Sequence, residues 1–252
     1  MGLEMAETAR RSFTHGEATA TGIRDHNEDR LGAHPEAGLF FVSDGVGGAP
    51  NGEVAAQTVV DRLLERLDAV QRDGAIAADP ETSLATAIAQ LSDELNERGQ
   101  QEPAIAGTGA TIVAALVTGG RCTIASLGDS PAYLMHDGQL VRLTTDHTIA
   151  QVLVDAGAIS EDAGENHPGR NKLTRYFGMK GPAHPDVTTV EVTPGDRLLM
   201  CSDGISGVLD QEYLLSALTA VGDPNTLCRA LVRAATNAKS KDNMTALVVD
   251  FH

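Results

Sequence analysis

Three aspartates share one local sequence pattern: an apolar run, one or two small residues, and then Asp beside Gly. They are Asp44 in LFFVSDGVGG, Asp129 in TIASLGDSPAYL and Asp203 in RLLMCSDGISG. An apolar run predicts a buried strand, and a glycine lets the backbone come close to a ligand. The pattern therefore predicts carboxylates at the edge of a sheet, with room for a metal ion or a phosphate.

Two further acidic sites adjoin other strand-like segments. Asp242 precedes the apolar run of KDNMTALVVD, and the pair Glu28 and Asp29 lies in GIRDHNEDR. Carboxylates gathered without nearby lysine repel one another unless cations neutralise them. Oxygen ligands of this kind favour Mg²⁺ or Mn²⁺, between which the sequence does not distinguish. Zinc is disfavoured because the eight histidines and three cysteines show no HExxH or Cys-x-x-Cys spacing.

Each of these residues also has a purely structural interpretation. A single Asp-Gly pair is more often a β-turn than a ligand, and Arg24, four residues before Glu28, could be the partner of a surface ion pair. Turn aspartates, however, need not recur beside extra glycines at the ends of the most apolar segments. The recurrence favours a binding site in which the Arg24 guanidinium holds a phosphate through two hydrogen bonds.

Strand-like segments must position these residues. We expect strands at 19–22, 39–43, 109–117, 122–127, 132–136, 187–192, 197–201 and 244–250. The pairs Gly119-Gly120 and Asp137-Gly138 are typical hairpin turns, so much of the sheet structure should be antiparallel. This pattern does not fit a Rossmann fold.

Helices are indicated by apolar spacing. One is expected at 54–67 after a cap at Asn51, a second at 84–95 after a cap at Ser83, and two more at 211–218 and 224–238. Between residues 146 and 181 the periodicity weakens while Gly, His, Asn and Pro accumulate. Long polar segments inside compact domains are often lids, so this segment is predicted to be a flap.

Composition sets the wider limits. The 252 residues include 19 Lys and Arg against 35 Asp and Glu, a formal net charge of −16, with 42% hydrophobic and 3% aromatic residues. This balance predicts one acidic domain spanning 1–252 and argues against nucleic-acid binding. No apolar run is long enough for a membrane span, and the N-terminus lacks the apolar segment of a secretory signal, so we expect a cytoplasmic protein with buried, reduced cysteines.

Eight segments in order resemble the motif series of the metal-dependent type 2C protein serine/threonine phosphatases, the PPM family, in its compact bacterial form. They are GIRDHNEDR, VSDGVGGAPNGEVAA, GTGATIVAALV, LGDSPAYL, LTTDHT, HPGRNKLTRYFG, DRLLMCSDGISGVL and KDNMTALVV. The resemblance implies an α+β fold, a four-layer αββα sandwich of two mostly antiparallel sheets flanked by helix pairs. It also implies a centre of two Mn²⁺ or Mg²⁺ ions at one edge, beside a flap at about 146–181.

The resemblance implies a set of metal ligands. Asp44 would bridge two ions, with Asp203 and Asp242 completing the shell of the first. Glu28 and the backbone carbonyl of Gly45 would serve the second ion. A third, weaker ion would lie between Asp129 and Asp203.

Other roles follow from the same resemblance. Arg24 occupies the phosphate-binding position, and Asp29 and Asn243 would orient the ligands. In the flap, His167 and Asn171 are candidate polar contacts, although a capped turn or a surface role is an equal alternative for each.

Two positions depart from the family pattern. Val46 follows Asp44-Gly45 where many eukaryotic relatives have a histidine proposed as general acid, so leaving-group protonation falls to water or to a flap group. Pro131 replaces the arginine usual after Gly-Asp-Ser, which removes a charge and a backbone donor beside Asp129. The third metal is therefore less firmly implied than the first two.

The implied function is hydrolysis of phosphoserine and phosphothreonine in proteins by a water that bridges two metal ions, opposing a serine/threonine kinase. Nothing in the sequence requires a dimer, and we expect a monomer. Two alternatives stay open: a phosphatase of small phosphoesters with the same site, and a non-catalytic module that binds phosphoproteins. A haloacid-type hydrolase and a P-loop nucleotidase are disfavoured because their motifs are absent.

Overall fold

Two five-stranded sheets form the centre of the molecule. The computed structural model describes residues 13–46, 51–72 and 79–252, so 47–50 of the second motif and the N-terminal segment lie outside the described residues. The first sheet has the order β1 (Phe13–Ala20), β10 (Met244–Phe251), β9 (Arg197–Cys201), β6 (Ala132–His136), β7 (Gln139–Arg142). The second has the order β2 (Arg30–His34), β3 (Leu39–Ser43), β4 (Ile112–Thr118), β5 (Arg121–Leu127), β8 (Asp186–Glu191). Neighbouring strands in both sheets pair antiparallel, as expected.

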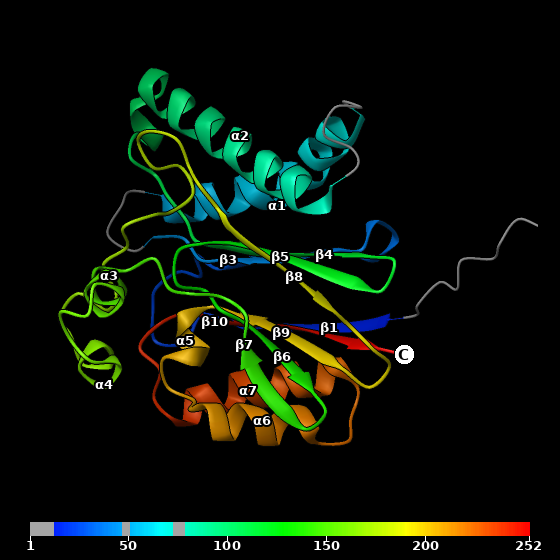
Figure 1. Ribbon diagram of the computed structural model, residues 1–252. Coiled ribbons are helices and arrows are strands. Elements are labelled where there is room, and N and C mark those ends of the chain that lie inside the picture. Colours follow the sequence, from blue (N-terminus) through cyan, green and yellow to red (C-terminus); the bar gives the residue numbers. More distant parts are fainter. Residues whose placement is uncertain (1–12, 47–50, 73–78) are drawn as a thin grey trace, which may run out of the picture.

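Helix pairs cover the outer faces of the sheets (Figure 1). The second sheet is covered by α1 (Gly52–Arg72) and α2 (Pro80–Gln101), and the first by α6 (Gln211–Thr219) and α7 (Pro224–Asn237). The short α5 (Asp203–Ser206) follows β9, and two 3₁₀ turns lie at Pro35–Ala37 and Pro103–Ile105. The expected αββα sandwich is confirmed.

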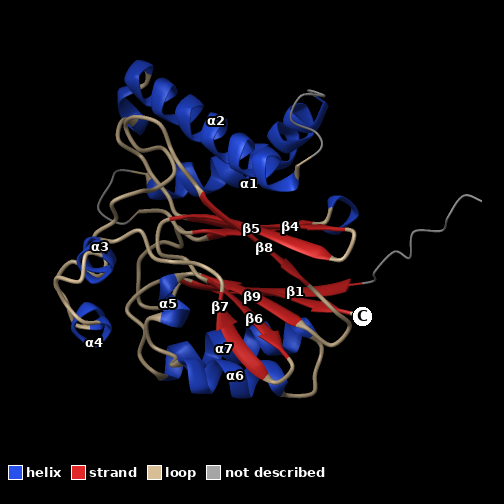
Figure 2. Cartoon of the chain, viewed as in Figure 1, coloured by secondary structure: helices blue, strands red, loops and turns tan. Residues whose placement is uncertain are grey.

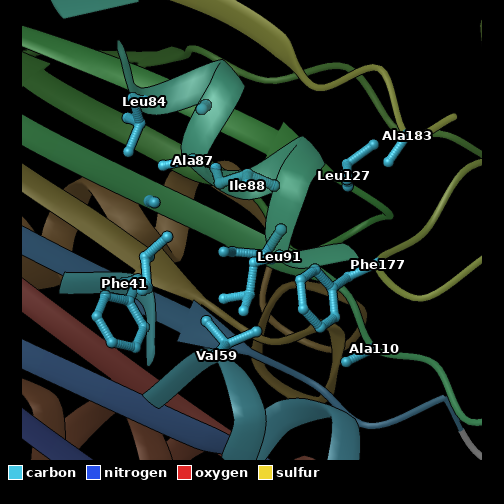
Figure 3. Close-up of a cluster of buried hydrophobic side chains, with 14 of the residues drawn as sticks. Phe41, Val59, Leu84, Ala87, Ile88, Leu91, Ala110, Leu127, Phe177 and Ala183 are labelled. Atoms are coloured by element: carbon cyan, nitrogen blue, oxygen red, sulfur yellow. The ribbon is translucent and has the colours of Figure 1, made fainter. Parts of the chain in front are cut away.

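One strand shows how the layers are built. In β3, Phe40 and Val42 pack between the two sheets, whereas Leu39 and Phe41 pack against α1 and α2. Successive side chains of a strand point to opposite faces, so a fully apolar strand contributes to two core layers at once. Figure 3 shows Phe41 in the outer layer, together with Phe177 from the end of the flap.

The segment at 146–181, called the flap below, contains the short helices α3 (Ile149–Asp155) and α4 (Glu161–Glu165), which lie beside the sandwich (Figure 2). Its two ends are joined by an isolated bridge between Thr148 and Leu173. The Thr148 hydroxyl caps α3, and the Ser160 hydroxyl caps α4. Local capping therefore produces two helices where the apolar periodicity is weak.

Several expectations about elements need correction. The first strand begins at Phe13 rather than 19, and β2 and β7 were not predicted. The cap of α2 is Asp79, whose carboxylate accepts from the N–H groups of Glu81 and Thr82, while Ser83 is buried inside the helix. Asn51 precedes α1, but with a φ of 63°, and its side-chain amide donates to the Ala104 carbonyl.

Two other expectations hold. Gly119 and Gly120 (φ 55° and 83°) and Asp137 and Gly138 (φ 48° and 73°) form the predicted hairpin turns, whose left-handed conformation suits these residues. Cys122, Cys201 and Cys228 are buried free thiols. In the described parts of the chain, no helix has the length and apolar character to cross a membrane.

Candidate active site

Sheet topology gathers the acidic strand ends at one end of the molecule. The strands β3 and β5 both run antiparallel to β4 between them, so Asp44 and Asp129 follow strands that end at the same edge. In the first sheet, β9 ends beside the start of β10, which brings Asp203 next to Asp242. The turn 128–131 leads from β5 in one sheet to β6 in the other, so the two edges adjoin.

These residues line a cleft of about 440 Å³. Its lining includes all five carboxylates implied as metal ligands, namely Glu28, Asp44, Asp129, Asp203 and Asp242, together with Gly45 and Arg24. The remaining residues of the lining are Val46, Gly107, Thr111, Asn171, Lys172, Leu173 and Tyr176. The flap thus supplies one wall, and the strand ends supply the rest.

Burial and mutual repulsion raise the pKa values of the carboxylates. Desolvation is the largest cause at Asp44, Asp129 and Asp203, followed in each case by a neighbouring carboxylate. The pKa of Asp44 lies well above its ordinary value, that of Asp129 is raised to about 8, and that of Asp203 to about 6. Cations bound beside these carboxylates would favour their ionised forms at neutral pH.

The donor set fits divalent oxygen-binding ions. One oxygen of Asp203 and one of Asp29 are buried without a hydrogen-bond partner in the described structure. Because Asp203 lines the cleft, its orphaned oxygen is available as a ligand. Among the described residues, no group of three or more acidic, histidine or cysteine side chains is already arranged to hold a metal ion. Ions that keep several waters take few direct protein ligands.

Asp29 and Asn243 lie where they can fix the ligands. The Asn243 amide donates to the carbonyls of Thr21 and His26, both at 2.9 Å, and its oxygen accepts from the Glu28 N–H at 2.8 Å. It therefore holds the whole loop between β1 and Glu28.

Asp29 is buried and accepts a 2.7 Å hydrogen bond from the Ser202 hydroxyl. Ser202 in turn accepts from the Thr245 N–H at 3.0 Å. This link connects the ends of β9 and β10 to the residue next to Glu28. Neither side chain could be assigned its partners from the sequence.

Glycine allows the closest backbone contact at the site. A Cβ on Gly204 would lie 1.8 Å from the Asn243 carbonyl oxygen, and one on Gly45 would lie 2.5 Å from the Gly52 carbonyl carbon. Both glycines adjoin a predicted ligand, Asp203 and Asp44. The sequence pattern of Asp beside Gly therefore has a steric cause at these two positions.

Thr111 and Ser130 are site residues that the sequence did not single out. The Asp44 N–H donates to the Thr111 hydroxyl at 3.0 Å, and that hydroxyl shares a 2.6 Å hydrogen bond with Ser130. Together they connect the end of β3 to the turn that carries Asp129. No local signal could have found them, because their partners are distant in sequence.

His147 is a further unpredicted connection, although the motif LTTDHT contains it. Its buried ring accepts from the Gly128 N–H at Nδ1 (3.1 Å), and its Nε2 lies 3.0 Å from Asp186. Burial is the main cause that lowers the pKa of His147, which favours the neutral ring, with Nε2–H donating to Asp186. Arg175 also binds Asp186 through both terminal nitrogens. His147, at the start of the flap, thus binds the turn before Asp129. Through Asp186 it is also connected to Arg175, near the end of the flap.

Arg24 forms the ion pair that one interpretation expects, and it also lines the cleft, as the phosphate-binding interpretation requires. Its Nη2 lies 2.6 Å from Asp242, its Nε donates to the Lys241 carbonyl at 2.8 Å, and its half-exposed side chain lines the cleft.

The two flap candidates differ in position. Asn171 lines the cleft, but His167 does not. The His167 Nδ1 accepts a 3.0 Å hydrogen bond from the Gly169 N–H, which is the capped turn considered as its alternative. Lys172 and Tyr176 line the cleft without having been predicted, because their neighbours come from other segments.

The fold and cleft together define a class. An αββα sandwich that gathers carboxylates of raised pKa beside an arginine at one end has the donor set of a metal-dependent phosphoester hydrolase. Comparison with known proteins makes this class specific.

The family model described as Protein phosphatase 2C matches residues 22–246. The serine/threonine phosphatase stp of Listeria monocytogenes is 32% identical over 233 residues, covering 90% of this chain and 91% of its own length. The serine/threonine protein phosphatase PstP of Mycobacterium tuberculosis is 33% identical over 228 residues; the match covers 90% of this chain and 43% of PstP.

Among solved structures, the catalytic domain of PstP in complex with two manganese ions matches with a TM-score of 0.80 at 30% identity, covering 95% of this chain and 98% of that one. The chain belongs to the protein phosphatase 2C family. It spans less than half the length of PstP.

Proposed function

We propose that the protein is a metal-dependent phosphoprotein phosphatase that hydrolyses phosphoserine and phosphothreonine. The observation that carries the proposal is the convergence of five carboxylates and Arg24 in one cleft of a chain from this family. The relatives named serine/threonine phosphatases support the same activity.

The cofactor would be two Mn²⁺ or Mg²⁺ ions, and the PstP structure with two manganese ions supports this choice. Asp44 would lie between the ions, Asp203 and Asp242 would bind the first, and Glu28 and the Gly45 carbonyl the second. Asp129 with Asp203 could hold a third. When bound, such ions activate water and offset the charge of the phosphoryl group.

The remaining steps belong to the chain's own residues. Arg24, fixed by Asp242 and the Lys241 carbonyl, is placed to bind a phosphate oxygen. Asp29 and Asn243 keep Glu28 and its loop in position through their hydrogen bonds. Val46 offers no proton beside Asp44, and the described lining contains no histidine, so the leaving group takes its proton from water or from a flap residue.

We further propose a cytoplasmic monomer that acts on phosphorylated proteins and opposes a serine/threonine kinase. The acidic composition and the names of the relatives support this placement in signalling.

The test is phosphate release from a phosphothreonine peptide and from p-nitrophenyl phosphate, each with Mn²⁺, with Mg²⁺ and with EDTA. Asp44→Asn should reduce metal-dependent release by about 100-fold or more, since the loss of a ligand exceeds that of a residue behind it. Asp93→Asn, on the exposed face of α2, is the matched control and should retain activity.

Two outcomes would contradict the proposal. Release from p-nitrophenyl phosphate alone would indicate a phosphatase of small esters. No phosphate release from either substrate, with metal shown to bind, would indicate a non-catalytic binding module.

A further inference from the structure

The flap carries three basic residues close together, and they differ in what they contact. Arg170 donates to the Glu165 carbonyl at 3.1 Å, and Arg175 is held by Asp186 and by the His184 carbonyl. Lys172 lies between them, is exposed and lines the cleft. Its ammonium has no hydrogen-bond or ion-pair partner in the described part of the chain. Among the described flap residues that line the cleft, Lys172 is therefore the cation that is free to meet a ligand.

The backbone of Lys172 is fixed even though its side chain is free. Its N–H donates to the Gly169 carbonyl at 3.2 Å, and its own carbonyl accepts from the Ile149 N–H at 2.9 Å. The next residue, Leu173, is bridged to Thr148 at the start of α3. The lysine stem therefore starts from a defined point on the cleft wall.

The cations with the largest effects on the carboxylate cluster are arginines. The arginines with the largest effect on the pKa values of the cluster are Arg24, at Glu28 and Asp203, and Arg142, at Asp129. Lys172 is not among the main charges that shift the pKa values of these groups. The other cation of the lining, Arg24, is already paired with Asp242.

We propose that Lys172 forms a specificity subsite that binds an acidic side chain of the substrate near the phosphorylated residue. The inference rests on the proposed phosphatase function. A phosphate held at the carboxylate end fills only part of a cleft of about 440 Å³, so flanking residues of the substrate must lie along the flap wall. That wall offers the amide of Asn171, the apolar Leu173, the ring of Tyr176 and a single charge, which is positive. In a chain of net charge −16, this lysine supplies a local attraction that the surface as a whole does not.

The test compares phosphothreonine peptides that carry Glu, Gln or Lys within two positions on both sides of the phosphothreonine. The control substrate, p-nitrophenyl phosphate, has no flanking residues. The native protein should prefer the Glu peptide to the Gln peptide about two- to fivefold in kcat/KM, the range of an exposed ion pair. Lys172→Ala should abolish this preference, Lys172→Glu should reverse it toward the Lys peptide, and Lys172→Arg should retain it. High salt should weaken it.

Lys180→Ala is the matched control, because Lys180 is an exposed flap lysine that does not line the cleft. This variant should keep the native preference. No preference in the native protein, or a preference unchanged in Lys172→Ala, would overturn the proposal. If Lys172→Ala lost kcat/KM equally on all peptides and on p-nitrophenyl phosphate, the ammonium would contact the phosphate itself. That result would also overturn the proposal.

A binding measurement tests the subsite independently of the proposed phosphatase activity. Labelled Glu and Gln peptides are titrated by fluorescence anisotropy against Asp44→Asn and against the Asp44→Asn, Lys172→Ala double variant. Tighter binding of the Glu peptide that disappears in the double variant supports the subsite. Equal binding of both peptides to Asp44→Asn refutes the subsite, whether or not the native protein releases phosphate.

Discussion

Burial of several carboxylates in one cleft has a cost that depends on pH. The raised pKa values of Asp44, Asp129 and Asp203 mean that their ionised forms are less favourable in the folded protein than in the unfolded chain. Below about pH 4 these carboxyls are protonated in both states, and their burial costs no ionisation energy. Stability is lost as the pH rises from there to about 6 for Asp203 and to about 8 for Asp129.

We therefore expect the metal-free protein to lose stability between about pH 4 and pH 8, and Mn²⁺ to stabilise it most at the upper end of this range. Thermal unfolding in EDTA and in Mn²⁺ measures both effects. Asp129→Asn should flatten the pH dependence in EDTA, because an amide does not ionise. A slope in Asp129→Asn as steep as in the native protein would refute this assignment.

Gly204→Ala tests the close approach of α5 to the start of β10. The new Cβ would lie 1.8 Å from the Asn243 carbonyl oxygen, so the backbone must move. We expect a loss of about 1–3 kcal/mol in the free energy of unfolding, measured by urea denaturation. Activity should fall as well, since Asp203 and Asp242 would be displaced relative to each other.

Gly222→Ala is the control for Gly204→Ala. A Cβ on Gly222 would have its nearest neighbour, the Leu227 side chain, 3.9 Å away, which is an ordinary contact. Its stability and activity should stay near native values. Equal effects of the two substitutions would show that the close approach is not what requires glycine at position 204.

The sequence predicts the residues whose signal is local and misses those whose signal is not. Asp44, Asp129 and Asp203 are found because an apolar strand and a glycine adjoin each one. Thr111 and His147 have no such signal, since their partners Ser130 and Gly128 come from other segments.

At the scale of elements, the flap is attached to the sandwich through His147. His147→Ala would leave the Gly128 N–H without its acceptor and remove the donor to Asp186. We expect Mn²⁺ affinity to fall about 10-fold, measured by calorimetry, because residues behind metal ligands have effects of this size. Limited proteolysis within the flap should become faster.

His184→Ala is the control for this substitution, since the His184 side chain is exposed and lies just after the flap. It should change neither the affinity nor the proteolysis rate. Native Mn²⁺ affinity in His147→Ala would show that the connection to Gly128 does not position Asp129.

Element prediction fails where local patterns are weak and tertiary contacts decide. β2 contains Gly32 and has a charged or polar residue at each end. β7 has only four residues, beginning with Gln139 and ending with Arg142. Neither strand therefore shows a clear alternation of apolar and polar residues. Both exist because a neighbouring strand supplies hydrogen bonds. Ser83 is a plausible cap by type, but Asp79 followed by Pro80 is the actual start of α2.

At the scale of the molecule, the three thiols report on cooperative unfolding. Cys122 lies between the sheets, and Cys201 and Cys228 lie under α6 and α7. Burial raises the pKa of each thiol to about 12. We expect none to react with a thiol reagent at pH 8 in the folded protein, and all three to react together on unfolding in guanidinium. One thiol reacting well before the others would contradict the single domain predicted from the sequence.

The strand β10 follows every other described strand in the chain, yet it lies between β1 and β9. During synthesis, β1 leaves the ribosome first and has no partner in its sheet until β10 has been made. Asp242 and Asn243 arrive with β10, so the loop at Glu28 also waits for its hydrogen bonds. A nascent chain therefore cannot complete the cleft before β10 has been translated.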